Sequence, residues 1–184
     1  SVVKVAPGIG HDLVPGGVEA EWVSDNGEVK EAALWSPDLA TARRRATVIS
    51  GDGLVSITDE DDPYQGKERP VVELGQHLYE PDGAVIRAGL VTAVAAGVEG
   101  GLIDPHIAYV TSQKSYRSPF MKAYYVIEEL PYREKQLKAA LIERNIGPIT
   151  IKKRGVEIVP EQLRKRLGLT GDVEATIVLT RING

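Results

Sequence analysis

The sequence predicts a mixed α/β protein in two parts. In residues 1–58, short runs that alternate apolar and polar residues are separated by Gly, Pro, Asn and Asp, which is typical of half-buried strands and turns. After residue 70, strand-like runs alternate with runs whose apolar residues recur every three or four positions, as in helices that pack on a sheet. A length of 184 residues fits one domain, or one domain with an attached lobe.

The first part is expected to consist mostly of strands. Asp25-Asn26-Gly27 is a strong signal for a hairpin turn between two of them. The apolar positions are too few to predict an independent core for this part. The expected strands span residues 2–6, 18–24, 28–35, 46–49 and 54–57.

A charged segment, residues 59–69 (DEDDPYQGKER), is predicted to link the two parts. It contains Pro and Gly, and it lacks the ligand spacing of a calcium loop. The sequence therefore suggests one domain at residues 1–69 and a second, more self-sufficient one at residues 70–184.

The second part is predicted to alternate strands and helices. Asp82 is the expected N-cap of an almost entirely apolar helix over residues 84–96. Pro131 is expected to open a helix over 132–144, and Pro160 a helix that contains Leu163 and Leu167. The remaining expected strands span residues 71–80, 107–111, 121–130, 149–151 and 175–179.

The composition excludes several classes of protein. Cysteine is absent, which rules out disulfides and cysteine nucleophiles and suits a cytoplasmic location. No apolar run approaches the roughly 20 residues of a membrane span, so we expect no membrane association. The net charge is −4, but residues 131–184 hold 11 basic and 6 acidic residues, an excess of +5 that is compatible with a polyanion site.

No catalytic or metal-binding residue is predicted. His11, His77 and His106 are scattered, so structural or surface roles are expected for each. Pro7-Gly8-Ile9-Gly10 follows a strand, but neither a helix signal nor a third glycine follows it, and a plain turn is expected.

The basic residues near the C-terminus are the candidate binding site. Phosphate recognition needs Lys and Arg side chains gathered on one surface, and we predict one patch that contacts RNA phosphates. The alternative is that these cations, which lie near a helix C-terminus, only interact favourably with the negative end of the helix dipole. The predicted RNA-binding residues are Lys152, Lys153, Arg154, Arg164, Lys165 and Arg181.

A second basic cluster, Arg43, Arg44 and Arg45, could instead pair with the acidic segment that follows it.

Several phrases resemble a family of bacterial class I S-adenosylmethionine-dependent methyltransferases. They are VKVAPGIGHDLVP, RRRATVIS, LYEPDGAVIRAGL and the closing IKKRGVEIVPEQLRKRLGLTGD…ATIVLTR, which together cover essentially the whole chain. The resemblance implies that residues 1–69 are the end of a Rossmann-like catalytic sheet, which closes with an antiparallel hairpin. It also implies that residues 70–184 form a THUMP-like domain.

This resemblance leaves two functions open. The chain could be the substrate-recognition region of a methyltransferase that acts on RNA, such as tRNA or rRNA. Alternatively, it could be a structural or dimerisation domain that packs on an upstream catalytic lobe without touching nucleic acid. The family's glycine-rich cofactor loop would lie upstream, so S-adenosylmethionine is expected in the parent protein, and this chain alone is expected neither to bind it nor to catalyse methyl transfer.

Overall fold

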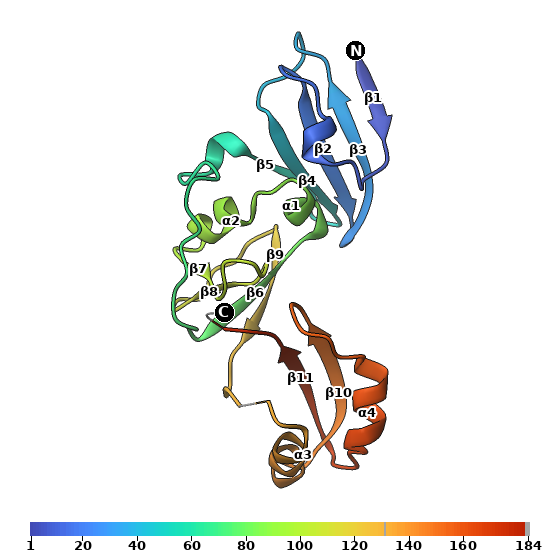
Figure 1. The fold of residues 1–184 in the computed structure, drawn as a ribbon, viewed down its shortest axis with the longest axis vertical. Coiled ribbons are helices and arrows are strands. Elements are labelled where there is room, and N and C mark those ends of the chain that lie inside the picture. Colours follow the sequence, from blue (N-terminus) through green and yellow to red (C-terminus); the bar gives the residue numbers. More distant parts are fainter. Residues whose placement is uncertain (131, 183–184) are drawn as a thin grey trace. The chain divides into compact units, whose positions relative to one another are not determined.

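The computed structural model describes residues 1–130 and 132–182. The chain is mixed α/β, as the sequence predicts, and it divides into two compact units, Ser1–Val126 and Ile127–Gly184. Figure 1 shows the order of the elements along the chain.

The first unit contains a five-stranded sheet with the order β1-β3-β2-β4-β5. β3 is antiparallel to both of its neighbours, β1 and β2, so β1 and β2 run parallel to each other. β4 is parallel to β2, and β5 returns antiparallel to β4. The strands are β1 (Val2–Val5), β2 (Glu19–Asp25), β3 (Glu28–Trp35), β4 (Arg44–Ser50) and β5 (Gly53–Thr58).

The turn between β2 and β3 confirms the hairpin that the sequence predicts. Asn26 and Gly27 have φ angles of 49° and 86°. Two central residues with positive φ form the turn whose twist matches that of paired strands, and Asn-Gly is the favoured pair for it.

A second sheet of the first unit has the order β7-β8-β6-β9. Its strands are shorter than the sequence predicts: Val71 makes only a single bridge with Leu102, and the segment from residue 126 to residue 130 is not a strand. The strands are β6 (His77–Pro81), β7 (Gly101–Leu102), β8 (Val110–Ser112) and β9 (Met121–Tyr125).

The apolar segment after Asp82 forms two short helices instead of the single expected one, α1 (Gly83–Arg87) and α2 (Val91–Gly97). Asp82 caps α1 as predicted, because its carboxylate accepts a hydrogen bond from the Ala84 N–H at 2.8 Å. The helix is interrupted at Gly89, whose φ of 68° is left-handed and incompatible with a continuing helix.

One hydrophobic core joins both sheets and both helices of this unit. α1 packs on the five-stranded sheet and α2 on the four-stranded sheet (Figure 1). Trp22 of β2, which is fully buried, belongs to the same cluster as Tyr79 of β6 and Leu90. The chain before residue 59 and the chain after residue 83 therefore share a core, and the charged segment does not separate two compact units.

The second unit has a parallel pair of strands, β10 (Ile146–Lys153) and β11 (Val173–Leu179). Helices α3 (Glu134–Glu143) and α4 (Pro160–Leu167) bury Leu137, Leu141, Leu163 and Leu167 in one cluster with Ile149, Ile151 and Leu179. Pro160 begins α4 as predicted. The predicted opening of α3 at Pro131 lies outside the described residues.

Candidate nucleic-acid interface

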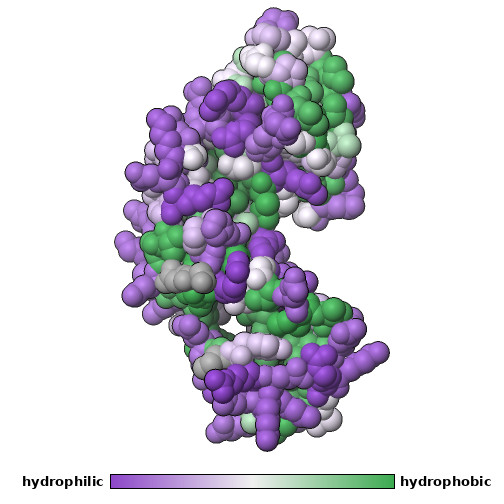
Figure 2. Space-filling view, in the orientation of Figure 1, coloured by the Kyte–Doolittle hydropathy of each residue, from purple (hydrophilic) through white to green (hydrophobic). Residues whose placement is uncertain are grey.

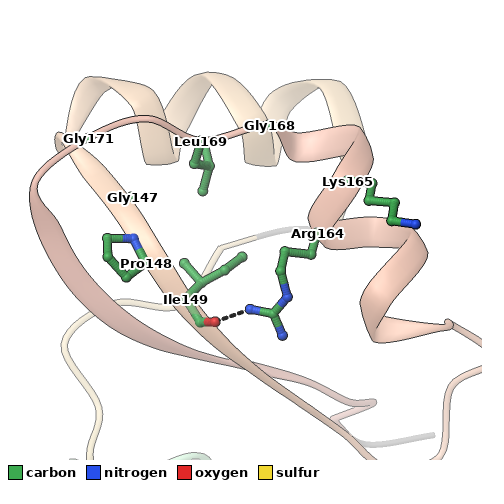
Figure 3. A pocket seen from close by; sticks show the side chains of 8 residues that line it. All are labelled: Gly147, Pro148, Ile149, Arg164, Lys165, Gly168, Leu169 and Gly171. Carbon is green, nitrogen blue, oxygen red and sulfur yellow. Dashed lines mark hydrogen bonds between the residues drawn. The ribbon is translucent and has the colours of Figure 1, made fainter.

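A groove in the second unit lies between the first half of β10 and the end of α4 (Figure 3). Its volume is about 500 Å³. α4 ends at Gly168, which takes a left-handed conformation and donates its N–H to the Arg164 carbonyl oxygen at 3.1 Å. The groove is lined by Gly147, Pro148, Ile149, Arg164, Lys165, Gly168, Leu169 and Gly171.

The backbone passes very close to itself at one end of this groove. A Cβ atom on Gly147 would lie 1.7 Å from the carbonyl oxygen of Gly171, and a Cβ on Gly171 would lie 2.2 Å from that of Asn145. Both positions therefore require glycine, since any side chain would push the start of β10 away from the turn that leads into β11.

Arg164 connects α4 to the edge of β10. Its Nη1 donates to the carbonyl oxygen of Ile149, and its Nη2 lies 3.3 Å from a carboxylate oxygen of Glu161. Lys165, the next residue, is exposed and extends away from the strand into solvent (Figure 3). The two cations thus lie on the same rim, but only Arg164 is directed at the strand.

The other predicted RNA-binding residues are not gathered with these two. Lys152 is opposite Val178 and Lys153 is opposite Leu179 in the strand pair, and successive residues of a strand point to opposite faces. Lys153 is on the face that α3 and α4 cover, and Lys152 is on the other face. The predicted single patch is therefore wrong in geometry: a run of three basic residues that continues a strand divides between its two faces.

Arg154 and Arg181 follow the ends of the two strands. The Arg154 N–H donates to the Leu179 carbonyl oxygen at 3.0 Å, which extends the parallel ladder by one bond, and Arg181 is exposed beyond β11. Both lie at the carboxyl ends of the strands, whereas the groove is at the opposite ends.

Arg166 has a structural role that the sequence did not reveal. Its Nε lies 2.6 Å from a carboxylate oxygen of Glu134, which ties α4 to α3. The hydrogen bond with Glu134 raises the pKa of the Arg166 guanidinium. Of the three consecutive basic residues of α4, Arg166 is therefore the one that links α4 to α3.

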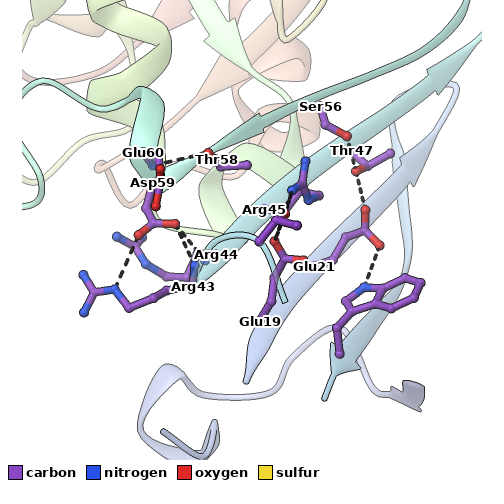
Figure 4. A network of polar contacts seen from close by, with 12 residues as sticks. Glu19, Glu21, Arg43, Arg44, Arg45, Thr47, Ser56, Thr58, Asp59 and Glu60 are labelled. Atoms are coloured by element: carbon purple, nitrogen blue, oxygen red, sulfur yellow. Dashed lines mark hydrogen bonds and ion pairs between the residues drawn. The ribbon is translucent and has the colours of Figure 1, made fainter. Parts of the chain in front are cut away.

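The arginine cluster at the start of β4 pairs within its own unit, as one reading of the sequence allowed (Figure 4). The backbone N–H groups of Arg43 and Arg44 both donate to Asp59 Oδ1 at 3.0 Å, and Arg45 bonds Glu19 at 3.1 Å. Burial raises the pKa of Asp59, but the hydrogen bonds from Arg44 and Arg43 lower it more, so the pKa lies below its ordinary value.

The acidic segment is likewise bound to the first unit. Asp61 forms a capping box with Thr58, and Asp62, only 2% exposed, accepts a hydrogen bond from the Thr92 hydroxyl at 2.7 Å. These contacts attach the first residues of the segment, Asp59 to Asp62, to the first unit.

A polar network on the five-stranded sheet was also missed by sequence reasoning. The two carboxylate oxygens of Glu21 accept hydrogen bonds from Trp35 Nε1 at 3.1 Å and from the Thr47 hydroxyl at 2.6 Å, and Thr47 contacts Ser56 at 2.7 Å (Figure 4). The signal was present as alternate polar residues on neighbouring strands, but their pairing depends on the register.

Neither a metal site nor a membrane-spanning helix is found among the residues that the structure describes. Within residues 1–130 and 132–182, no group of three or more His, Cys, Asp or Glu side chains could hold a metal ion. In the same residues, no helix has the length and apolar character to cross a membrane.

Two of the three histidines make contacts within the first unit. His11 Nε2 forms a hydrogen bond with the Arg87 carbonyl oxygen at 2.6 Å. The rings of His77 and Tyr125 meet edge to face, with their centroids 5.6 Å apart.

Comparison with known proteins places this geometry in a class. Residues 121–184 match the family described as THUMP domain-like. The chain is 37% identical over 187 aligned residues to two Mycobacterium tuberculosis proteins, from strains CDC 1551 / Oshkosh and ATCC 25618 / H37Rv, each described as an uncharacterized S-adenosylmethionine-dependent methyltransferase. The alignment covers 98% of this chain and 50% of each relative, so the chain spans about half the length of the curated relatives it matches.

A solved structure agrees in fold. A crystal structure described as that of a "putative methyltransferase from Porphyromonas gingivalis W83" superposes with a TM-score of 0.76 at 23% identity, and the match covers 99% of this chain and 48% of that one. The chain is thus a relative, over nearly its whole length, of S-adenosylmethionine-dependent methyltransferases, and it ends in a THUMP-like domain. The THUMP-like match begins at residue 121, not at the predicted residue 70.

Proposed function

We propose that this chain is the substrate-recognition region of an S-adenosylmethionine-dependent methyltransferase that acts on RNA. The observation that carries the proposal is the β1-β3-β2 order, in which a reversed strand lies between two parallel ones. This is the antiparallel end expected of a class I catalytic sheet, and it is joined in one chain to a THUMP-like domain.

The outer edge of β1, opposite β3, supports our proposal that the catalytic part lies outside this chain. Val2 is 49% exposed and Val3 is 56% exposed, and the two point to opposite faces of the sheet. Figure 2 shows hydrophobic residues at the surface over this region. β1 pairs with β3 on one edge, and no described strand pairs with its other edge. An exposed apolar edge of this kind favours pairing with a further strand, and the relatives are about twice as long as this chain.

The cofactor would belong to that other part. The loop after β1, Pro7–Gly10, leads into a three-residue 3-10 turn, His11–Leu13, and not into the helix of a glycine-rich cofactor loop. This loop therefore lacks the strand–loop–helix geometry of a glycine-rich cofactor site, and no chemical step is assigned to it.

Two arms test the proposal. The full-length protein, incubated with S-adenosylmethionine carrying a labelled methyl group, should transfer label to total RNA and not to RNase-treated extract. The 184-residue chain should bind bulk tRNA in a filter assay at 50 mM salt, with log affinity falling by roughly 0.7 to 0.9 per phosphate contact as log salt rises. Label in protein or small molecules only, with no RNA binding at low salt, would contradict it.

The second candidate is a structural role without nucleic acid. It is favoured by the intramolecular contacts of Arg164 and Arg166, which use part of the basic charge of α4. This candidate predicts no salt-dependent RNA binding by the chain.

A further inference from the structure

The groove between β10 and α4 has a predominantly apolar floor. The ring of Pro148 and the side chain of Leu169 lie across from each other in it, and Gly147, Gly168 and Gly171 contribute backbone without side chains (Figure 3). Its volume of about 500 Å³ is that of a typical small-ligand pocket, roughly 300–1,000 Å³. A flat, partly apolar group can therefore lie against this floor.

Among the residues that the structure describes, the charged groups that line the groove are the cations Arg164 and Lys165, and no carboxylate lines it. Glu161 is bound to Arg164. The groove thus combines an apolar floor with a basic rim, which is the charge complement of a nucleotide.

Arg164 is held in place for such a ligand. Its bonds to the Ile149 carbonyl oxygen and to Glu161 use two of the five guanidinium N–H donors. A planar guanidinium whose position is already fixed loses little conformational entropy when its remaining donors bind a phosphate.

One feature opposes an anion here. The groove faces the carboxyl end of α4, and the partial negative charge of a helix C-terminus disfavours an anion. A charge-assisted hydrogen bond to a phosphate oxygen is stronger than this repulsion, so the two cations outweigh the dipole.

We propose that this groove binds one nucleotide of an RNA strand, with the base or ribose against Pro148 and Leu169, the phosphate beside Arg164, and the exposed side chain of Lys165 turned from solvent toward that phosphate. The proposal rests on the proposed function in RNA recognition and assigns it to a site. It excludes Lys152, Arg154 and Arg181 from the same nucleotide, because Lys152 lies on the other face and the two arginines follow the far ends of the strands.

The test uses Lys165, which is exposed and can be changed without disturbing the core. Lys165→Ala is compared with Lys135→Ala, a change of the same charge at an exposed position of α3 outside the groove. The probe is a fluorescein-labelled decauridylate, followed by anisotropy at 50, 100 and 200 mM salt. We expect Lys165→Ala to weaken binding about tenfold at 50 mM salt and to reduce the salt slope by about 0.7, and Lys135→Ala to do neither.

A second measurement locates the ligand independently of affinity. Adenosine monophosphate, titrated into ¹⁵N-labelled chain, should shift the amide resonances of Gly147, Leu169 and Gly171, whereas inorganic phosphate should shift only those near Arg164 and Lys165. If the chain binds decauridylate but Lys165→Ala equals Lys135→Ala, or if the shifts lie elsewhere, the groove assignment fails while RNA recognition stands. If wild-type chain binds neither decauridylate nor bulk tRNA, the proposed function fails as well.

Discussion

Arg44 Nη1 donates a hydrogen bond to the carbonyl oxygen of Ala88 at 2.6 Å, and the same group reaches the Gly89 carbonyl oxygen at 3.0 Å. A residue of β4 thereby caps the end of α1, across the charged segment that the sequence marks as a boundary. Carbonyls at a helix C-terminus have no partner within the helix, and a cation there also interacts favourably with the helix dipole.

Arg44→Met should lower the free energy of unfolding by about 1–3 kcal/mol, because it leaves two carbonyl oxygens without their charged donor. Urea unfolding followed by tryptophan fluorescence measures this. Arg43→Met is the matched control: its side chain is 80% exposed and forms one loose ion pair, so its effect should stay within about 1 kcal/mol. Equal effects of the two changes would contradict a capping role for Arg44.

The acid dependence of stability should include a contribution from Asp59. Its pKa in the folded state lies below the unfolded value of about 3.9. Its contribution is therefore present above about pH 4 and is lost as the pH falls through the folded pKa. Asp59→Asn should lower the free energy of unfolding by about 1–2 kcal/mol at pH 7, and the difference from wild type should shrink below pH 4.

The control for this prediction is Asp52→Asn, because Asp52 is exposed in the turn between β4 and β5. Its unfolding free energy should follow that of the wild type at every pH. A constant difference between wild type and Asp59→Asn from pH 7 to pH 3 would show that the charge of Asp59 is not what stabilises the fold.

The compact units predict which fragments fold. Residues 1–126 should fold alone, with blue-shifted emission from the buried Trp22. In a fragment of residues 70–184, residues 70–126 should bind a hydrophobic dye and lack protected amides, while the second unit stays folded on its own core. The reason is that Tyr79, Val85 and Leu90 lose the partners that they have in the five-stranded sheet. Hydrogen-exchange protection of residues 77–125 in that fragment would restore the boundary in the charged segment.

The core of the second unit should be sensitive to one buried leucine. Leu167 of α4 is fully buried, so Leu167→Ala should destabilise that unit by about 2–5 kcal/mol. Ile142→Ala, at a position of α3 that is 57% exposed, should change stability by no more than about 0.5 kcal/mol. Hydrogen exchange of the β10 and β11 amides measures both, since it reports on this unit separately.

Local signals determined much of the secondary structure from the sequence alone. The Asn26-Gly27 turn, the Asp82 cap and the Pro160 start of α4 were all predicted correctly, because each depends on backbone conformations or hydrogen bonds within a few residues. The resemblance to methyltransferases with a THUMP-like end is also confirmed by the comparisons. The substrate and the predicted RNA-binding residues stay predictions.

Contacts between distant residues decided the rest. The charge of residues 59–69 suggested a linker. However, Asp59 binds the start of β4, Asp62 binds Thr92, and the chain before the segment shares one hydrophobic core with the chain after it. The six predicted RNA-binding residues were grouped by their nearness in sequence, but the alternation of a strand sends Lys152 and Lys153 to opposite faces, and only Arg164 and Lys165 share a groove. Composition specifies which charges are present, whereas the register of the strands and the packing of the helices decide which of them meet.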